Sequence, residues 1–561
     1  MSAPNFSSCA QCSHPFLSSF KDNFSLLHSA LDETTSTLAT LLGTNNYPNP
    51  DQYAILRASR GKVENALQEI DIIMEHLEHE RRRLHDIQES HRRVMSSVCH
   101  LPVEILSKIF ALSTSSFYDV FGPKLMEGPW ALSKICSQWR GVAIGCCPEI
   151  WKNMNIAFNV DPRDPEALLR LVFSRCRAGP LHIRIGYVDN IVINLLSIVM
   201  EESPRWRSFE VYYPDPQLMD TLGAVRGKLD ILESLSLRLS NDPGQGLITT
   251  FEIAPSLKTV ELMGQKGEIR VSLPFSQLVS YSDDSYPPAP GVSTTEYFLN
   301  IFKKSPRLLR LHAGCYTWFP GQYLTVHPFV EPPIVHKSLE ELSSYDPALL
   351  RSVLLPELRV VNMEIPDGGN SLRTPLLALR ELIVKSNCSL TSLTLRNIGL
   401  GDRGAPYWRD VLDLTPSLTK LEVVMRHGFG TYTMDFLSGL AKGLAEKREN
   451  SENPPRYDIV PLLTDLTIEV ADAAPGSIVY YSFLNCNFVD MVASRYHSAA
   501  LRRVRVVVKS NGGNEGTDFW KFGNDEFKRM EELRTDGLKI YVFEEIGRRG
   551  EQIDHLVTEA V

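Results

Sequence analysis

Short apolar units recur along the C-terminal two thirds of this chain and limit what it can fold into. Each unit reads LxxLxL or a close variant, such as Leu232–Leu235–Leu237 and Leu257–Val260–Leu262. Side chains alternate across a strand, so the last two apolar residues of a unit point to the same face. A short strand cannot bury such a face alone, and the strands must therefore stack on one another. The other units begin at Leu308, Leu339, Leu358, Leu379, Leu390, Leu418, Leu463 and Leu501.

The spacing of these units is irregular. It ranges from 11 residues between Leu379 and Leu390 to 51 residues between Leu257 and Leu308. The pattern resembles leucine-rich repeats, whose period is about 20 to 29 residues, and it predicts a degenerate α/β solenoid with helices on the outer side. The short step after Leu379 leaves no room for a helix, which predicts a tight connection or a lost repeat there. Outer helices are expected over residues 166–175, 294–304 and 434–446.

A separate apolar stretch covers residues 101–151. It begins LPVEILSKIFALS, continues through a loop with FGP and GPW, and ends ALSKICSQWRGVAIGCCPEIW. Apolar residues follow helical spacing in both halves, and Pro102 occupies a first-turn position, where its fixed φ suits the start of a helix. The stretch carries Trp130, Trp139 and Trp151. Three short helices cannot cover this much apolar surface, so we expect part of it to bind a partner protein.

This stretch resembles an F-box. The matching residues follow the family's LPxEIL…IF…VCxxWRxxA…PxLW pattern, with Ile135 and Ile150 in place of the usual valine and leucine. The resemblance implies three helices that dock onto the Skp adaptor, which hangs substrate receptors on a cullin-based ubiquitin ligase. The adaptor-binding residues that it implies, either as the surface itself or as its braces, are Leu101, Pro102, Ile105, Leu106, Ile109, Phe110, Trp139, Pro148, Ile150 and Trp151.

Residues 62–98 carry a heptad stripe. Apolar residues recur at alternating steps of four and three, which is typical of a long helix with a coiled-coil seam, and Asp51 is the expected cap. The seam weakens where Arg81, Gln88 and His91 fall on it. We therefore favour packing on the protein's own downstream helices over a homodimer through residues 62–98, although the pattern allows both. The apolar members of the stripe are Val63, Leu67, Ile70, Met74, Leu77 and Leu84.

A long heptad helix placed before an F-box also resembles the layout of a group of fungal F-box proteins. Together, the features predict an α+β protein of several domains. A mostly disordered segment, with at most one short helix near residues 24–42, precedes the long helix. The predicted boundaries are 1–50 for the disordered segment, 51–98 for the long helix, 99–155 for the F-box, 156–545 for the solenoid and 546–561 for a flexible tail.

Composition argues against several classes of function. A net charge of −9 over 561 residues leaves no basic stripe for nucleic acid. No apolar run is long enough to span a membrane, and the ten cysteines show no disulfide spacing, which predicts a cytoplasmic or nuclear protein with reduced thiols. Cys9, Cys12 and His14 form half of a zinc pattern without a second pair, so no metal is expected. No phosphate loop, nucleophile elbow or zinc-protease motif occurs, so we expect neither an enzyme nor a cofactor.

The strand units also predict where a substrate would bind. In a solenoid the strands line the concave face, and the residue between the two inward apolar positions of each unit points onto that face. The expected row mixes charges of both signs, which suits a protein substrate better than a nucleic acid. Its members are Ser236, Glu261, His312, Asn362, Ile383, Thr394, Glu422, Thr467 and Arg505, flanked by Arg238, Lys385, Arg396 and Glu469.

These expectations converge on a substrate-recruiting F-box subunit of a Skp–cullin–F-box ubiquitin ligase, which would direct a protein substrate to ubiquitin-dependent degradation. Two other interpretations remain open. One is a scaffold that binds the Skp adaptor and a partner protein without ubiquitination, and the other is an enzyme with an unrecognised site on the solenoid. Co-purification of a cullin separates the first two, whereas the third requires titratable residues gathered on one surface.

Overall fold

The chain forms two compact units, residues 1–105 and residues 106–561, and the division falls inside one helix. Each unit is described here by itself. The predicted zinc half-site at Cys9, Cys12 and His14 lies outside the described residues. The computed structural model describes residues 34–44, 46–95, 97–114, 116–122, 127–157, 164–186, 193–214, 216–239, 247–264, 271–284, 294–314, 332–364, 373–396, 407–425, 431–447, 457–473, 484–498, 500–510, 524–546 and 551–554.

The N-terminal unit contains one long helix, α2 (Pro50–Val94). Asn49 caps it, because the Asn49 side chain accepts a hydrogen bond from the Gln52 backbone N–H (2.8 Å) while the Gln52 side chain accepts one from the Asn49 N–H (3.0 Å). The expected cap, Asp51, instead lies in the first turn. Residues 34–44 are also helical, and they overlap the end of the segment where one short helix was expected. Thr34 contacts Ser59 of α2 through their hydroxyls (3.2 Å).

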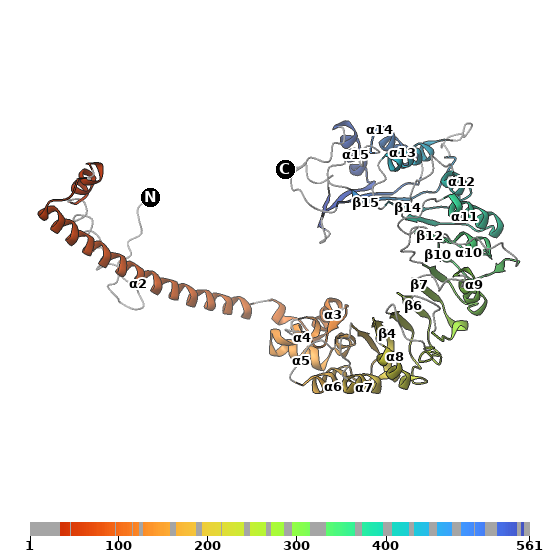
Figure 1. Ribbon diagram of the computed structural model, residues 1–561, viewed down its shortest axis with the longest axis horizontal. Coiled ribbons are helices and arrows are strands. Elements are labelled where there is room, and N and C mark those ends of the chain that lie inside the picture. Colours follow the sequence, from red (N-terminus) through yellow and green to blue (C-terminus); the bar gives the residue numbers. More distant parts are fainter. Residues whose placement is uncertain are drawn as a thin grey trace. The chain divides into compact units, whose positions relative to one another are not determined.

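In the part of the chain that the structure describes, the C-terminal unit is built on a sheet of 16 strands that follow one another in chain order (Figure 1). Neighbouring strands are parallel up to the last pair, which is antiparallel. Leu181, Ile183 and Ile185 alternate with half-exposed residues and bury one face of β3, as the period of a strand dictates. Two short strands, β9 and β11, form a second small sheet.

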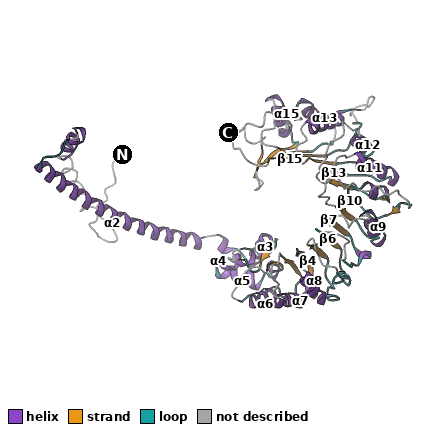
Figure 2. Cartoon of the chain, in the orientation of Figure 1, coloured by secondary structure: helices purple, strands orange, loops and turns teal. Residues whose placement is uncertain are grey.

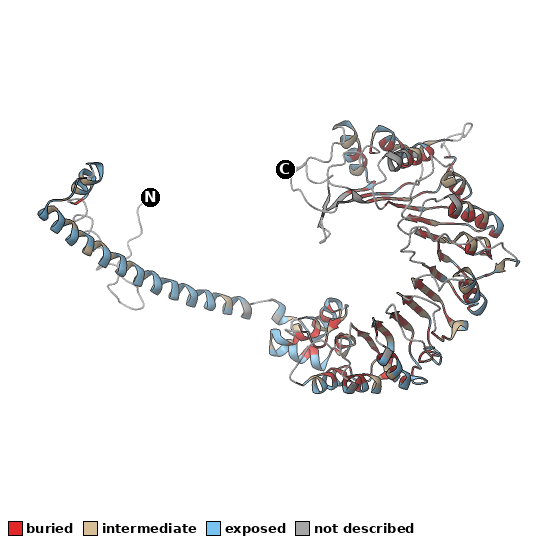
Figure 3. Ribbon diagram, viewed as in Figure 1, coloured by how far each residue is buried: buried red, intermediate tan, exposed pale blue. Residues whose placement is uncertain are grey.

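Helices fill many of the connections between parallel strands and lie along one side of the sheet (Figures 1 and 2). The apolar face of the sheet packs against them, which Figure 3 shows as a buried layer between strands and helices. The strands are β1 (Tyr118–Asp119), β2 (Asn153–Ile156), β3 (Leu181–Ile185), β4 (Trp206–Tyr212), β5 (Ser234–Arg238), β6 (Thr259–Met263), β7 (Ser280–Asp284), β8 (Arg310–Ala313), β9 (Ile334–Val335), β10 (Glu341–Ser343), β11 (Val353–Leu354), β12 (Val360–Glu364), β13 (Ser392–Arg396), β14 (Lys420–Met425), β15 (Asp465–Ala473), β16 (Arg503–Ser510), β17 (Lys539–Ile546) and β18 (Glu551–Asp554).

The predicted helices over residues 166–175, 294–304 and 434–446 are confirmed as α6, α9 and α13, with ends shifted by up to three residues. The helices after α2 are α3 (Val103–Ser113), α4 (Gly128–Ile135), α5 (Ser137–Gly145), α6 (Pro165–Arg175), α7 (Ile193–Glu201), α8 (Pro216–Leu222), α9 (Thr294–Lys304), α10 (Pro347–Arg351), α11 (Arg373–Ser386), α12 (Tyr407–Asp413), α13 (Thr431–Ala445), α14 (Cys486–Ser498) and α15 (Asn524–Thr535). Short 3-10 turns are η1 (Ser97–His100), η2 (Pro148–Trp151), η3 (Ser203–Arg205), η4 (Gly223–Val225) and η5 (Phe275–Gln277).

One predicted strand unit is wrong. Leu379 and Leu382 lie in helix α11 and are buried there, because leucines three residues apart also share a helix face. The tight connection expected after Leu379 therefore does not exist, and α11 itself connects β12 to β13. Ile383 and Lys385, which were expected on the strand face, belong to this helix instead, and Ile383 is buried.

The predicted combination of helices and stacked strands is correct at the level of fold class. The protein mixes α and β structure, and its sheet is open, with β1 and β18 at its two edges. β1 lies within the stretch that carries the tryptophans, and β2 directly follows that stretch. β1 pairs with β2, and β2 pairs with β3 in the main sheet. Helices α4 and α5 and all of these strands consequently belong to one compact unit.

Candidate functional site

Helices α3, α4 and α5 and the turn η2, here called the helical module, pack around Trp151. Its indole is fully buried and donates a hydrogen bond from Nε1 to the Ala143 carbonyl on α5 (2.8 Å). Trp130 on α4 meets it edge to face, with ring centroids 5.0 Å apart. Phe110 on α3 packs on Trp139 of α5, at 4.8 Å between centroids. Aromatic contacts of this kind hold short helices whose backbones alone would be marginal.

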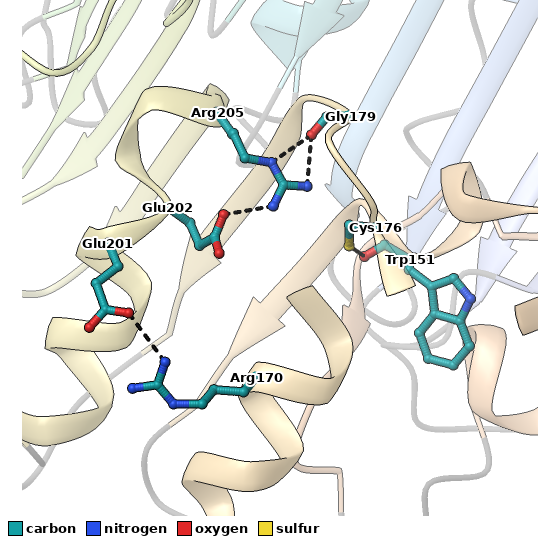
Figure 4. Close-up of polar contacts among 7 residues, drawn as sticks. All are labelled: Trp151, Arg170, Cys176, Gly179, Glu201, Glu202 and Arg205. Atoms are coloured by element: carbon teal, nitrogen blue, oxygen red, sulfur yellow. Dashed lines mark hydrogen bonds and ion pairs between the residues drawn. The ribbon is translucent and has the colours of Figure 1, made fainter. Parts of the chain in front are cut away.

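The same tryptophan fastens the helical module to the sheet. The Arg175 guanidinium on α6 lies 4.4 Å from the Trp151 ring centroid and 4.9 Å from that of Trp130. Burial lowers the pKa of Arg175. In the described structure its Nε and Nη1 make no hydrogen bond, and the cation–π contacts with the two indole rings stabilise the charge instead. The Trp151 carbonyl accepts hydrogen bonds from the Tyr118 hydroxyl on β1 (3.1 Å) and from the Cys176 thiol (3.2 Å), as Figure 4 shows for Cys176.

Polar contacts also link α6 to α7 and brace the turn before β3. Arg205 donates from Nε and Nη2 to the Gly179 carbonyl, at 3.1 and 3.0 Å, and pairs with Glu202 at 2.6 Å (Figure 4). Arg170 on α6 and Glu201 on α7 form an exposed ion pair at 3.2 Å. The half-buried Arg205 contacts fix the turn before β3, whereas the exposed pair adds little because water screens it.

Each helix of the helical module leaves an isoleucine at the surface. Ile109 on α3 is 42% exposed, Ile135 on α4 58% and Ile144 on α5 36%. We call these three the module isoleucines. Leu112 on α3 is exposed even further. Exposed branched side chains on every helix of one small module make it a candidate surface for binding a protein.

The structure divides the predicted adaptor-binding residues into two groups. Leu106, Phe110, Ile150 and Trp151 are at most 1% exposed, so they can brace the surface but cannot touch a partner. Leu101, Trp139 and Pro148 are half-buried, whereas Pro102, Ile105 and Ile109 are exposed. The prediction omitted Leu112, Ile135 and Ile144, although their spacing on apolar helix faces was the available signal.

A second candidate surface is the face of the sheet that points away from the helices, here called the strand face. Its middle residues occupy equivalent register positions on successive strands, so the predicted residues other than Ile383 fall into one row with others that were not predicted. This central polar row consists of Asp119, Asn155, Arg184, Glu210, Ser236, Glu261, Ser282, His312, Ser343, Asn362, Thr394, Glu422, Thr467, Arg505 and Tyr541.

Hydrogen bonds join many neighbours of the central polar row across the strands. Ser236 donates to Glu261 (3.1 Å), and Asn362 donates to Ser343 (3.1 Å). Arg396, one pleat further along β13, pairs with Glu422 at 3.1 Å. The remaining predicted substrate residues also lie here: His312 contacts Asp284 at 2.6 Å, while Thr394 is buried among its neighbours.

Arginines and aromatic rings stack on the strand face near its N-terminal end. The Arg184 guanidinium lies 3.9 Å from the Phe117 ring centroid and 5.4 Å from that of Tyr212, and it pairs with Glu210 at 2.7 Å. The Arg238 guanidinium covers Tyr212 at 4.5 Å. Arg238 makes no side-chain hydrogen bond or ion pair with the described residues. A guanidinium held flat on a ring presents its N–H groups in a fixed plane.

Most residues of this stack were not predicted from the sequence. Arg184, Glu210 and Tyr212 lie on β3 and β4, whose sequences LHIRI and WRSFEVY lack the leucine unit. The alternation of apolar and polar residues, which is complete in LHIRI and runs from Phe209 onward in WRSFEVY, was the signal that could have revealed them. Arg238 was expected only as a flanking residue of the row.

Neither surface shows the marks of metal chemistry. Within the described ranges, no three His, Cys, Asp or Glu side chains gather closely enough to hold a metal ion. None of the helices in those ranges is long and apolar enough to cross a lipid bilayer. No protein-family model matches the chain, and no curated protein matches it.

Proposed function

We propose that this protein is a substrate-recruiting F-box subunit of a Skp–cullin–F-box ubiquitin ligase. In this proposal, the helical module is the F-box and binds the Skp adaptor. The parallel strands with their outer helices form a degenerate leucine-rich-repeat solenoid, and its strand face binds the protein substrate. The LPxEIL and WRxxA residues at positions 101–143 and the repeated leucine units support this assignment.

The observation that carries the proposal is the exposure of the module isoleucines around a fully buried tryptophan core. The buried interior, with Phe110, Ile150 and Trp151 at most 1% exposed, holds the helices in place. Part of each outer isoleucine remains exposed to water, which is unfavourable at about 25 cal/mol for each Å² of apolar area. A docked adaptor would remove this area from solvent.

The strand face fits the second half of the proposal. It carries charges of both signs, and it offers the aromatic and arginine side chains that dominate protein-binding energy, Tyr212 and Arg238 among them. A nucleic-acid backbone would require a predominantly basic stripe. The strand face does not provide one, because the acidic residues Glu210 and Glu261 share its central polar row with Arg184.

Co-expression with a Skp adaptor tests the proposal. We expect Ile109→Asp/Ile135→Asp to lose the adaptor, because truncated or charged anchor positions commonly cost about 2 kcal/mol or more each. Leu171→Asp is the matched control, since Leu171 is a 43% exposed leucine on α6 outside the helical module. An unchanged melting temperature and circular dichroism spectrum establish that each variant is folded.

Two further readouts separate the alternatives. An Arg238→Glu/Tyr212→Ala variant is expected to keep the adaptor and lose the substrate, because it changes only the strand face. A cullin that co-purifies with the wild-type chain supports the ligase role, whereas adaptor binding without a cullin indicates a scaffold. Full adaptor binding by the folded double isoleucine variant contradicts the assignment of the helical module.

A further inference from the structure

The long helix α2 exposes its heptad stripe. Leu67 is 55% exposed, Met74 54%, Leu77 62% and Leu84 63%, whereas Val63 and Ile70 are half-buried. Figure 3 shows exposed residues along much of α2. Tertiary packing of an apolar face supplies most of the stability of a helix in a protein. In the described part of the N-terminal unit, residues 34–44 reach α2 at Ser59, before the stripe begins.

We propose that the stripe from Val63 to Leu84 pairs with the same stripe of a second copy, as a parallel and in-register two-stranded coiled coil. This reverses the preference for packing on the protein's own downstream helices, which rested on the polar seam residues Arg81, Gln88 and His91. This inference is independent of the function proposed above. The stripe covers 22 residues from Val63 to Leu84, about three heptads, which is the length from which apolar heptads indicate a coiled coil. Only a helix whose apolar residues repeat every 3.5 residues keeps contact along the whole seam. A second copy of this chain carries such a helix and is always present at the same concentration.

The charges beside the stripe favour the parallel arrangement. Leu67, Met74 and Arg81 are the a positions of the heptads, and the residue before each of them is a g position. In a parallel pair, each g residue faces the e residue that lies five positions further along the other copy. Ala66 then faces Asp71, Ile73 faces Glu78 and Glu80 faces His85, so none of these flanking pairs brings like charges together. An antiparallel pair with the same overlap would instead bring Asp71 beside Glu78 of the second copy, and this contact is repulsive.

Arg81 interrupts the seam and gives the proposal a specific signature. In the parallel pair it faces Arg81 of the second copy, next to Glu80, and a single polar seam residue of this kind lowers stability while it fixes the register. Arg81→Leu should therefore tighten the dimer about tenfold or more, because each copy gains a buried leucine. If the chain does not dimerise through this seam, the same change adds only exposed apolar area.

Light scattering on the full-length protein at about 10 µM tests the assembly, in a range where coiled coils of this length associate. We expect twice the chain mass for wild type and the chain mass for Ile70→Asp/Leu77→Asp. Gln68→Asp/Arg82→Asp, on the outer side of the helix, is the matched control and should remain dimeric. A monomeric wild type overturns the proposal, and so does a folded seam variant that stays dimeric.

Disulfide trapping tests the orientation. Leu77→Cys should cross-link the two copies under mild oxidation, because identical seam positions adjoin in a parallel pair. Glu75→Cys, on the outer side, should not exceed the wild-type background from the native cysteines. Equal cross-linking at both positions, or none at Leu77→Cys in a dimer, overturns the parallel arrangement. The circular dichroism spectrum and the melting temperature of the C-terminal unit should be unchanged in every variant.

Discussion

At the scale of single residues, Arg495 is the most unusual feature of the interior. It lies on α14, is 0% exposed and has no carboxylate beside it in the described structure. Its guanidinium donates to the carbonyls of Leu444, Ile459 and Val460 at 2.7 to 2.9 Å and stacks on Tyr457. Burial lowers the pKa of Arg495 to about 10, so the side chain remains charged at neutral pH. It therefore ties the end of α13 and the turn before β15 to α14.

Replacing Arg495 tests this role. Arg495→Met should lower the free energy of unfolding by about 3 kcal/mol or more, because three buried carbonyls lose their donors. Arg495→Lys should recover only a small part, since an ammonium cannot reach three carbonyls from one plane. Arg226→Met is the control, because the Arg226–Glu252 pair is exposed and such pairs contribute about 1 kcal/mol or less. Urea unfolding measures all three, and a change at Arg495 no larger than at Arg226 contradicts the account.

Sequence reasoning could not find Arg495. Its helix reads CNFVDMVASRYHS, in which an arginine near the C-terminal end suggests an exposed residue that interacts with the helix dipole. Its three partners lie 35 to 51 residues earlier in the chain. Only the packing of α13 against α14 brings them together, and no local pattern records that packing.

At the scale of elements, the short helix α10 depends on its cap. The half-buried Asp346 accepts hydrogen bonds from the Ala348 backbone N–H (2.9 Å) and from the Thr295 hydroxyl on α9 (2.6 Å). Desolvation of the Asp346 carboxyl raises its pKa, although these hydrogen bonds act in the opposite direction. The carboxyl is thus protonated more readily in the folded state than in the unfolded state.

This direction predicts a pH dependence of stability. The raised pKa of Asp346 means that the folded state binds the extra proton, so its contribution to stability falls as pH rises from the unfolded pKa through the folded pKa. Asp346→Asn keeps an acceptor for Ala348 and Thr295 but does not titrate. The stability of the Asn variant relative to wild type should therefore increase between about pH 4 and about pH 7. Urea midpoints across this range measure it, and a difference that shrinks with rising pH contradicts the prediction.

Element type was predictable where the sequence pattern had a single interpretation. The leucine units from Leu232 onward became strands wherever the apolar residues alternated, because a period of two fits no helix. The Leu379 unit became α11 because its i, i+3 leucines fit both structures, and the longer apolar run of residues 373–386 decided for the helix. Strands β2 to β4 were missed because their buried residues are mainly methionine, isoleucine, phenylalanine and valine rather than leucine.

At the scale of the whole molecule, the pairing register of the strands brings residues from separate local patterns onto one surface. The sequence predicted eight members of the central polar row, from Ser236 to Arg505, because each lies between two buried residues of its own strand. The pairing of strands, which no local pattern encodes, aligned them and added Arg184, Glu210 and Tyr541. The exposure of the module isoleucines also depends on tertiary packing, since Leu106 and Ile109 look alike in the sequence but only Leu106 is buried.

The helical module from α4 onward and the strand face share one compact unit, because β1 and β2 extend the main sheet. A change in the Trp151 core should therefore disturb both surfaces together, whereas changes at exposed residues should separate them. For this reason, adaptor binding by the helical module must be tested with surface variants of a folded chain.

Titration calorimetry of the purified full-length protein with a purified Skp adaptor measures that claim most directly. The account predicts saturable binding of one adaptor per chain with a Kd of about 1 µM or tighter, weakened at least about tenfold by Ile109→Asp/Ile135→Asp and unchanged by Leu171→Asp. The absence of saturable binding to the folded wild-type chain at adaptor concentrations up to about 100 µM would contradict it.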